Sequence, residues 1–268
     1  MSPPWPPWEF DPGVILLLAI SALLYARGAC GPRRTARLPV ACFWCGWLVL
    51  AVALLSPLHE LGESLFSAHM VQHEILMLVC APLFVISRPL VPMLCGLPLR
   101  WRRGAGRWAK SRWVERIWRG LTAPAAAWWI HAAALWAWHA PPLFQATLAS
   151  DSAHAAQHLS FLVAALLFWW SLFHAHGRLG YGASVFYLFT TAVHTAILGA
   201  LLTLAPSLWY PAYAGRTAAW GLTPLQDQQI GGLIMWIPAG LVYLAAGLYF
   251  CAQWLRQSDA AVASWYPQ

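Results

Sequence analysis

The chain has 268 residues, of which 60% are hydrophobic and only 9% are charged, and its formal net charge is +7. A soluble domain carries about 25% charged residues, so this composition excludes an ordinary soluble fold and indicates a protein embedded in lipid. Because the apolar runs are long and do not alternate, and because backbone hydrogen bonds must close within lipid, we expect α-helices and exclude a β-barrel.

Apolar runs long enough to span a membrane recur along the chain, since a span needs about 20 residues. Seven runs are present, near 13–30, 38–58, 67–87, 121–140, 154–174, 184–205 and 229–253. No basic residue precedes the first run, so we expect an uncleaved span and not a signal peptide. Segment 99–120 interleaves arginines with tryptophans, which is typical of a partly helical segment on the anionic inner leaflet. The sequence therefore predicts an all-α, polytopic membrane protein with seven transmembrane helices, with 1–268 as a single membrane domain.

Basic residues are strongly biased to one side of the predicted membrane. If the seven spans alternate, Arg216 alone lies on the outer side, whereas the others lie in inner segments at 27–37, 88–119, 178 and 256. Because Lys and Arg mark cytoplasmic loops, the N-terminus is expected outside and the C-terminus in the cytoplasm. This bias accounts for the positive charge without nucleic-acid binding. Lys110, the one lysine, lies in an inner loop, which excludes a retinal Schiff base within a span.

A seven-residue motif occurs twice, as SAHMVQH at 67–73 and as SAHAAQH at 152–158, with five of the seven positions identical. Each copy opens a span that starts at the outer side, and we expect Ser67, Asp151 and Ser152 to cap these helices. The segment TPLQDQQ at 223–229 is a degraded third copy. We therefore expect a lone first helix followed by three related helix pairs, with binding sites between the units.

Six histidines are expected at one level near the outer face, where they form the predicted metal site. In a helix, positions four apart lie on the same face, so both histidines of each repeated motif point the same way. Two further histidines end the preceding spans at the same depth. The predicted metal ligands are His59, His69, His73, His139, His154 and His158.

Neutral imidazole binds copper, zinc and iron, and Met77 and Cys80, close to the face of the first pair, favour copper. A single interfacial histidine is more simply explained by hydrogen bonding, but a repeated pair at matched depth favours a ligand role. His131 and His194 lie near the middle of their spans and can bind metal, carry protons, ligate haem or contact a neighbouring helix. The two cysteines of the Cys-x-x-Cys sequence at 42–45 are interpreted as small side chains that pack within a span, and not as metal ligands or redox groups.

Three motifs together resemble the seven-span CtaG family of cytochrome c oxidase assembly factors. The first is the opening of the third span, followed by Ala81-Pro82 and Arg88-Pro89. The others are AHAAQH at 153–158 and DQQIGGLIMW at 227–236. The resemblance extends from about 40 to 250, in the expected order of spans.

The resemblance implies a multi-pass protein of the bacterial plasma membrane that helps copper reach the buried centre of a haem–copper oxidase. By motif it assigns ligand roles to His69, His73, His154 and His158, and it places Asp227 at the acidic position of the third motif. We therefore expect a non-enzymatic copper chaperone, with an oxidase subunit, membrane lipid and a copper donor protein as partners. Two alternatives stay open, a membrane redox protein that holds b-type haem and a metal transporter.

Overall fold

The computed structural model describes residues 5–8, 10–30, 35–174 and 176–265. Helices make up most of these residues, and no strand occurs among them. The predicted all-α class is therefore confirmed. Arg33 and Arg34, which contribute to the predicted charge bias, lie outside the described residues.

Among the described residues, six helical segments are long and apolar enough to cross a membrane, and each coincides with one of the predicted apolar runs. The third is continuous but changes its helix type, from α4 (Phe66–Glu74) through the π-helix η1 (Ile75–Cys80) to α5 (Ala81–Ser87). The others are α1 (Pro12–Ala29), α2 (Arg37–Leu55), α11 (Asp151–His174), most of α12 (His176–Thr203) and most of α13 (Pro224–Trp265).

The predicted span 121–140 corresponds to α9 (Pro124–His139), which has 16 residues. At 1.5 Å per residue its length is about 24 Å, whereas the hydrocarbon core of a bilayer is about 30 Å thick. Seven spans, and the orientation that depends on their number, therefore stay predictions.

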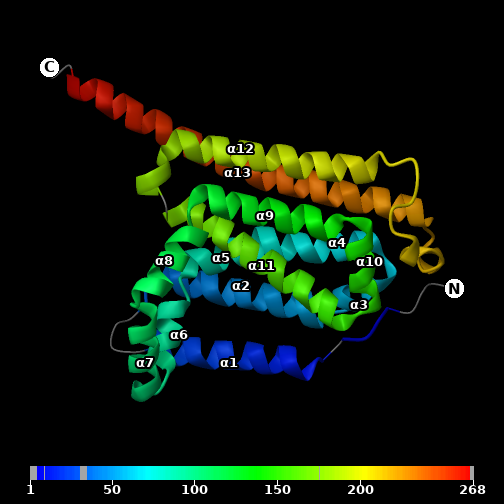
Figure 1. Cartoon of the computed structure of the whole chain (residues 1–268), viewed down its shortest axis with the longest axis horizontal. Helices are drawn as coiled ribbons and strands as arrows, with labels where there is room; N and C mark the ends of the chain where they lie inside the picture. Colours follow the sequence, from blue (N-terminus) through cyan, green and yellow to red (C-terminus); the bar gives the residue numbers. More distant parts are fainter. Residues whose placement is uncertain (1–4, 9, 31–34, 175, 266–268) are drawn as a thin grey trace.

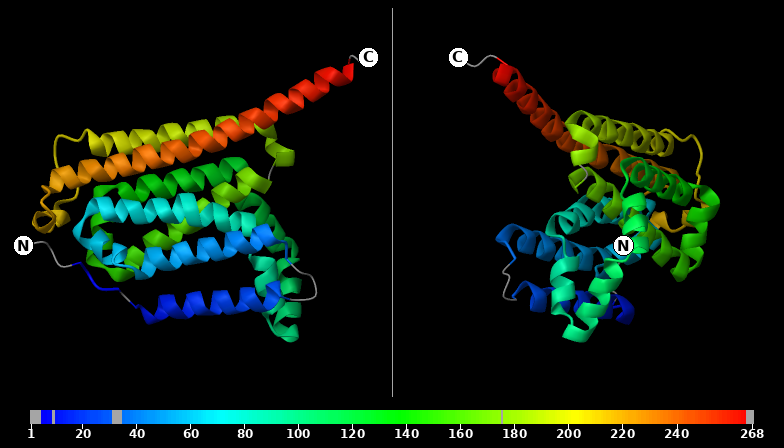
Figure 2. Two further views of the ribbon diagram at one scale, coloured as in Figure 1. Left: turned by 180° about the vertical axis from the view of Figure 1, so that it is seen from behind. Right: turned by 60° about the vertical axis from the view of Figure 1, so that its left-hand side comes forward.

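The long helices lie roughly side by side, and short helices cover the two ends of the bundle (Figures 1 and 2). One end, here called the basic end, carries α6 (Leu90–Gly96), α7 (Leu99–Ala109) and α8 (Arg112–Leu121). The opposite end, here called the histidine end, carries α3 (Leu58–Ser64), α10 (Pro141–Ala149) and the α12–α13 connection with its 3₁₀-helices η2 (Pro211–Tyr213) and η3 (Thr217–Trp220).

The predicted basic segment 99–120 forms α7 and α8, so its helical character is confirmed. Neither helix buries a residue in the protein, and Trp101, Trp108 and Trp113 are exposed on their surfaces. Exposed tryptophans among arginines suit a membrane surface, where the ring lies among headgroups.

The π-helical turn of η1 changes the register of the helix that carries the first histidine pair. A π-turn holds more residues per turn than an α-helix, so side chains after Glu74 do not follow the 3.6-residue period. The carbonyl oxygen of Met77 accepts a hydrogen bond from Trp169 Nε1 at 2.9 Å. The expectation that Met77 and Cys80 extend the histidine face is therefore not met, and Met77 lines a separate cavity.

Helices α12 and α13 approach each other closely at two glycines. A Cβ atom on Gly232 would lie 2.7 Å from both the carbonyl oxygen of Gly199 and the backbone nitrogen of Thr203. Small residues allow such contact between membrane helices, whose association depends on close packing.

Replacing Gly232 with alanine is expected to lower the free energy of unfolding by about 1–3 kcal/mol, because backbone atoms must move apart to admit the methyl group. Thermal unfolding in detergent measures the effect. Gly240→Ala on the same helix is the control, since its Cβ meets nothing within 4 Å and alanine favours a helix. Equal stability of the two variants would contradict the close approach.

Candidate functional site

The six histidines predicted to bind metal all belong to elements that meet at the histidine end (Figure 1). The two repeated pairs are between 0% and 8% exposed, and His59 is half-buried. The side chains of the repeated pairs therefore point into the protein and not toward lipid, as a metal site shared by the two pairs requires. The elements that supply them are α3 (His59), α4 (His69 and His73), α9 (His139) and α11 (His154 and His158).

The two repeated pairs face each other across the α4–α11 interface. The ring centroids within each pair are 4.3 Å apart. Between the pairs, the centroids of His69 and His154 are 5.0 Å apart, and those of His73 and His158 are 5.2 Å apart. His59 continues the cluster, with its ring stacked 5.0 Å from that of His154.

In the part of the chain that the structure describes, two groups of three histidines have possible ligand nitrogens within 4.8 Å of one another. One contains His59 and His154, the other contains His69 and His73, and His158 belongs to both. Around one tetrahedral ion with metal–nitrogen bonds near 2.0 Å, ligand nitrogens lie about 3.3 Å apart. Side-chain movements of about 1.5 Å would therefore bring either group to the geometry of a bound ion.

Several nitrogens of this cluster are buried without a hydrogen-bond partner among the described residues. They are both ring nitrogens of His73, together with Nε2 of His154 and Nε2 of His158. An unsatisfied buried polar atom costs about 1–3 kcal/mol, so native proteins retain few of them. Lone pairs left free at one place are what a metal ion would use.

The two glutamines of the repeated motif position histidines of the cluster. Gln157 Oε1 accepts a hydrogen bond from His69 Nε2 at 3.1 Å, which joins the second copy of the motif to the first. Gln72 Nε2 donates to the carbonyl oxygen of Ala53 at 2.7 Å and lies 3.1 Å from His59 Nδ1. Both glutamines are fully buried. Both copies of the motif have glutamine at the same position, which was the sequence signal for this positioning role. The partners of the glutamines lie in other helices, so the contacts themselves did not follow from the sequence.

Replacing Gln157 with leucine is expected to weaken metal binding by about 10- to 100-fold, as is usual when the partner that orients a ligand is lost. A competition titration with a Cu(I) chelator measures the change. Gln145→Leu is the matched control, because the Gln145 amide donates to Pro141 O within its own helix, α10. Equal affinities of the two variants would count against the positioning role of Gln157.

Asp227, in the first turn of α13, caps the helix that carries the first histidine pair. Its carboxylate accepts hydrogen bonds from the backbone nitrogens of Phe66 and Ser67, at 2.6 Å and 3.2 Å, and from the hydroxyl group of Ser67. The expectation that Ser67 itself caps this helix is therefore wrong, because Ser67 lies inside the first turn and donates to Asp227. On α11 the capping oxygen likewise belongs to Ser150, and not to Asp151 or Ser152, which lie inside the first turn.

His139 brings a thioether to the edge of the cluster. Its Nδ1 donates to the carbonyl oxygen of Leu135 at 2.7 Å, which leaves the lone pair of the neutral ring on Nε2. Nε2 lies 3.4 Å from Met70 Sδ, and nitrogen and sulfur ligands of one tetrahedral ion are about 3.5 Å apart. His139 belongs to neither group of three, since its ring centroid is 6.3 Å from that of His73.

Aromatic rings close one side of the cluster. The Phe144 ring lies 5.1 Å from the His69 ring and 4.3 Å from Tyr210, and Tyr210 stacks on Phe66 at 4.9 Å. All three aromatic side chains are fully buried. Apolar rings exclude water from this side and leave the half-buried His59 as the more accessible part of the site.

Two tyrosines of the α12–α13 connection hold the ends of the neighbouring helices. The hydroxyl group of Tyr210 donates to the carbonyl oxygen of His139, and that of Tyr213 donates to the carbonyl oxygen of Gly62, each at 2.8 Å. Burial raises the pKa of both phenols, so both stay protonated as donors. The role of these tyrosines was not predictable from the sequence, because they lie in an irregular connection.

Other residues singled out from the sequence lie apart from the cluster. His131 and His194 face each other with ring centroids 6.0 Å apart, and belong to neither histidine group. Cys42 is buried and Cys45 is exposed, and both are free thiols. Neither cysteine belongs to a group of possible ligands among the described residues.

A helical chain with six candidate spans and a buried histidine cluster at one end of the bundle is a membrane protein with a candidate metal site. The chain belongs to the Caa3_CtaG family, described as the cytochrome c oxidase caa3 assembly factor, whose model matches residues 22–257. The resemblance drawn from the three motifs is thereby confirmed.

Curated relatives include Uncharacterized protein Mb0105 of Mycobacterium bovis, which is 27% identical over 268 residues and 96% of this chain. Uncharacterized protein ML1998 of Mycobacterium leprae is 24% identical over 261 residues and 93% of this chain. The chain spans about two fifths of each of these relatives, since 40% of their length is covered. No solved structure matches the chain.

Proposed function

We propose that the chain is a non-enzymatic assembly factor for a haem–copper cytochrome c oxidase, which binds copper through its histidine cluster and assists copper delivery. The observation that carries this proposal is the meeting of two repeated histidine pairs, buried against each other, with free ring nitrogens. The family match supports the oxidase as the destination.

Copper is favoured over harder metals by the donor atoms. The cluster offers imidazole nitrogens as ligands, and Met70 adds a thioether beside His139. Imidazole and thioether together suit Cu(I), whereas magnesium and calcium require oxygen ligands. Because both groups contain His158, they overlap and together form a site for a single ion.

In this proposal α9 also crosses the membrane, which brings the number of spans to seven, and the chain is a multi-pass protein of the bacterial plasma membrane. The basic end faces the cytoplasm and the histidine end faces outward, with the N-terminus outside. A copper donor protein approaches the half-buried His59, and an oxidase subunit receives the ion. Helices α7 and α8 rest on anionic lipid of the inner leaflet.

Element analysis of the purified full chain, alone and as the His69→Ala/His73→Ala double variant, tests the proposal. The wild type is expected to carry copper at the cluster, and the variant is expected to lose this copper and to leave oxidase assembly impaired in cells. His174→Ala, which removes a histidine far from the cluster, is the control. Unchanged copper content and normal oxidase assembly in the double variant would overturn the proposal.

The visible spectrum and transport assays separate the alternatives. Beside His131 the protein leaves about 10 Å³ of free space, room for about one water molecule, so this position gives no support to a porphyrin. A Soret band in haem-replete protein would nevertheless favour the redox protein. Copper uptake into proteoliposomes would favour the transporter.

A further inference from the structure

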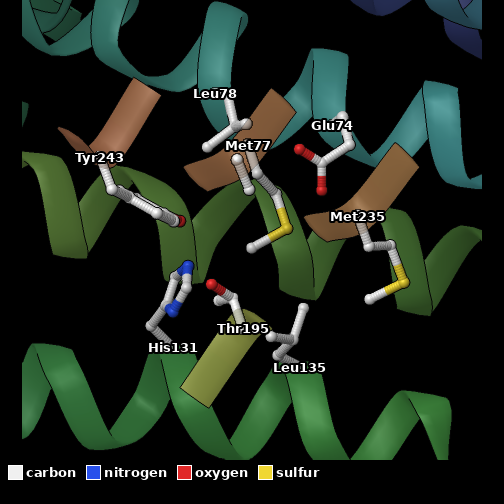
Figure 3. Close-up of a pocket in the computed structure, with 9 residues that line it drawn as sticks. Glu74, Met77, Leu78, His131, Leu135, Thr195, Met235 and Tyr243 are labelled. Atoms are coloured by element: carbon white, nitrogen blue, oxygen red, sulfur yellow. The ribbon is translucent and has the colours of Figure 1, made fainter. Parts of the chain in front are cut away.

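A small cavity lies among α4, η1, α9, α12 and α13, deeper in the bundle than the histidine cluster. Figure 3 shows its polar and sulfur-bearing side chains directed from these helices into a common space. The cavity offers about 10 Å³, which suits a single atom-sized occupant. The side chains that matter for its chemistry are Glu74, Met77, His131, Thr195, Met235 and Tyr243.

Two polar atoms at this cavity have no hydrogen-bond partner among the described residues. They are Oε2 of Glu74 and Nδ1 of His131, and the His131 side chain is 1% exposed. Within the apolar part of a membrane protein, ionisable groups are costly and are retained where they bind or conduct. A single cation in the cavity would bind both the carboxylate oxygen and the imidazole lone pair, and would offset the cost of burying them.

The sulfur atoms at the cavity indicate which cation fits. The chain has five methionines, and two of them, Met77 and Met235, are buried at this one small cavity. A water molecule gains little from thioethers, which are weak hydrogen-bond acceptors. A soft cation binds favourably to both thioethers, and thioether together with imidazole is the donor set that selects Cu(I).

We propose that this cavity is a second, intramembrane copper site, in which Met77, Met235 and His131 bind Cu(I) and the Glu74 carboxylate balances its charge. This inference rests on the proposed function, because it gives the copper of the histidine cluster a second position within the membrane.

The backbone connects the two positions directly. Glu74 follows His73 in α4, and His131 lies eight residues from His139 in α9, which is about 12 Å along the helix axis. The same two helices therefore contribute residues to both sites, so that copper can move inward between them while remaining next to protein ligands.

The test uses the full chain in lipid nanodiscs, with Cu(I) added anaerobically against a competing chelator. The variant Met77→Leu/Met235→Leu removes both thioethers at nearly constant side-chain volume, so it is expected to fold. Met93→Leu in α6, at the basic end, is the matched control. We expect two Cu(I) ions per wild-type and control chain and one per double variant, with reduced copper–sulfur scattering in X-ray absorption.

An unchanged number of ions and unchanged sulfur scattering in the Met77→Leu/Met235→Leu variant would overturn the second site and would leave water as the occupant. The His69→Ala/His73→Ala variant separates this result from the fate of the histidine cluster. If it retains one ion whose sulfur scattering is lost when Met77→Leu and Met235→Leu are added to the same chain, the inner site stands by itself. One wild-type ion that only the histidine substitutions remove overturns the inner site and leaves the proposed function intact.

Discussion

Replacing His158 with alanine is expected to weaken Cu(I) binding at the cluster by about a hundredfold or more, and by more than the loss of His59 does. His158 belongs to both groups of possible ligands, whereas His59 belongs to one group and is half-buried. Loss of a residue that only orients a ligand already costs about 10- to 100-fold, so loss of a shared ligand exceeds that range. Competition titrations of the two single variants measure the difference.

The thermal stability of the metal-free variants shows whether the fold is retained. His158 Nε2 is buried without a partner among the described residues, so truncation removes an unfavourable group together with the packing of the ring. The metal-free variant is therefore expected to unfold close to the wild type. Equal copper affinities of His158→Ala and His59→Ala would contradict the sharing of His158 between two groups.

Replacing Asp227 with alanine is expected to lower the free energy of unfolding by about 2–4 kcal/mol, since two backbone donors and one hydroxyl group of α4 lose their acceptor. Copper affinity is expected to fall as well, although the carboxylate bonds to the start of α4 and not to an imidazole. The helix that carries His69 and His73 begins at this contact.

Asp227→Asn is the control for the charge, because the amide retains one acceptor oxygen and nearly the same shape. It is expected to keep more of both stability and copper affinity than the alanine variant. Unfolding monitored in detergent and chelator titrations measure the two properties. Wild-type values for Asp227→Ala in both measurements would show that the cap does not position the cluster.

The long helices were predictable from sequence because lipid imposes one requirement on all of them. About 20 apolar residues with internally satisfied backbone groups can only be helices, so six of the seven apolar runs coincide with candidate spans among the described residues. The short helices α3 and α10 were not predicted, because 7 and 9 residues carry too little pattern and depend on tertiary contacts.

The candidate site was predictable in part, and the limit was set by distance along the chain. The four-residue spacing within each pair fixes a shared helix face, so the orientation of His69 with His73 follows locally. Contacts between distant segments do not follow from spacing, as for Gln157 with His69 and Asp227 with Ser67. Met77 was misplaced for a different reason, because nothing in the apolar sequence 75–80 distinguishes a π-turn from an α-turn.

The carboxylate that anchors α4 enters the bundle with α13, which follows every other described helix along the chain. During synthesis the histidines of α4 are thus inserted long before the contact that fixes their helix exists. A chain whose translation or insertion stalls before α13 has the imidazoles but not the anchored geometry. If the cluster binds metal as proposed, immature chains would capture it poorly, and occupancy of the cluster would mark a chain whose synthesis is complete.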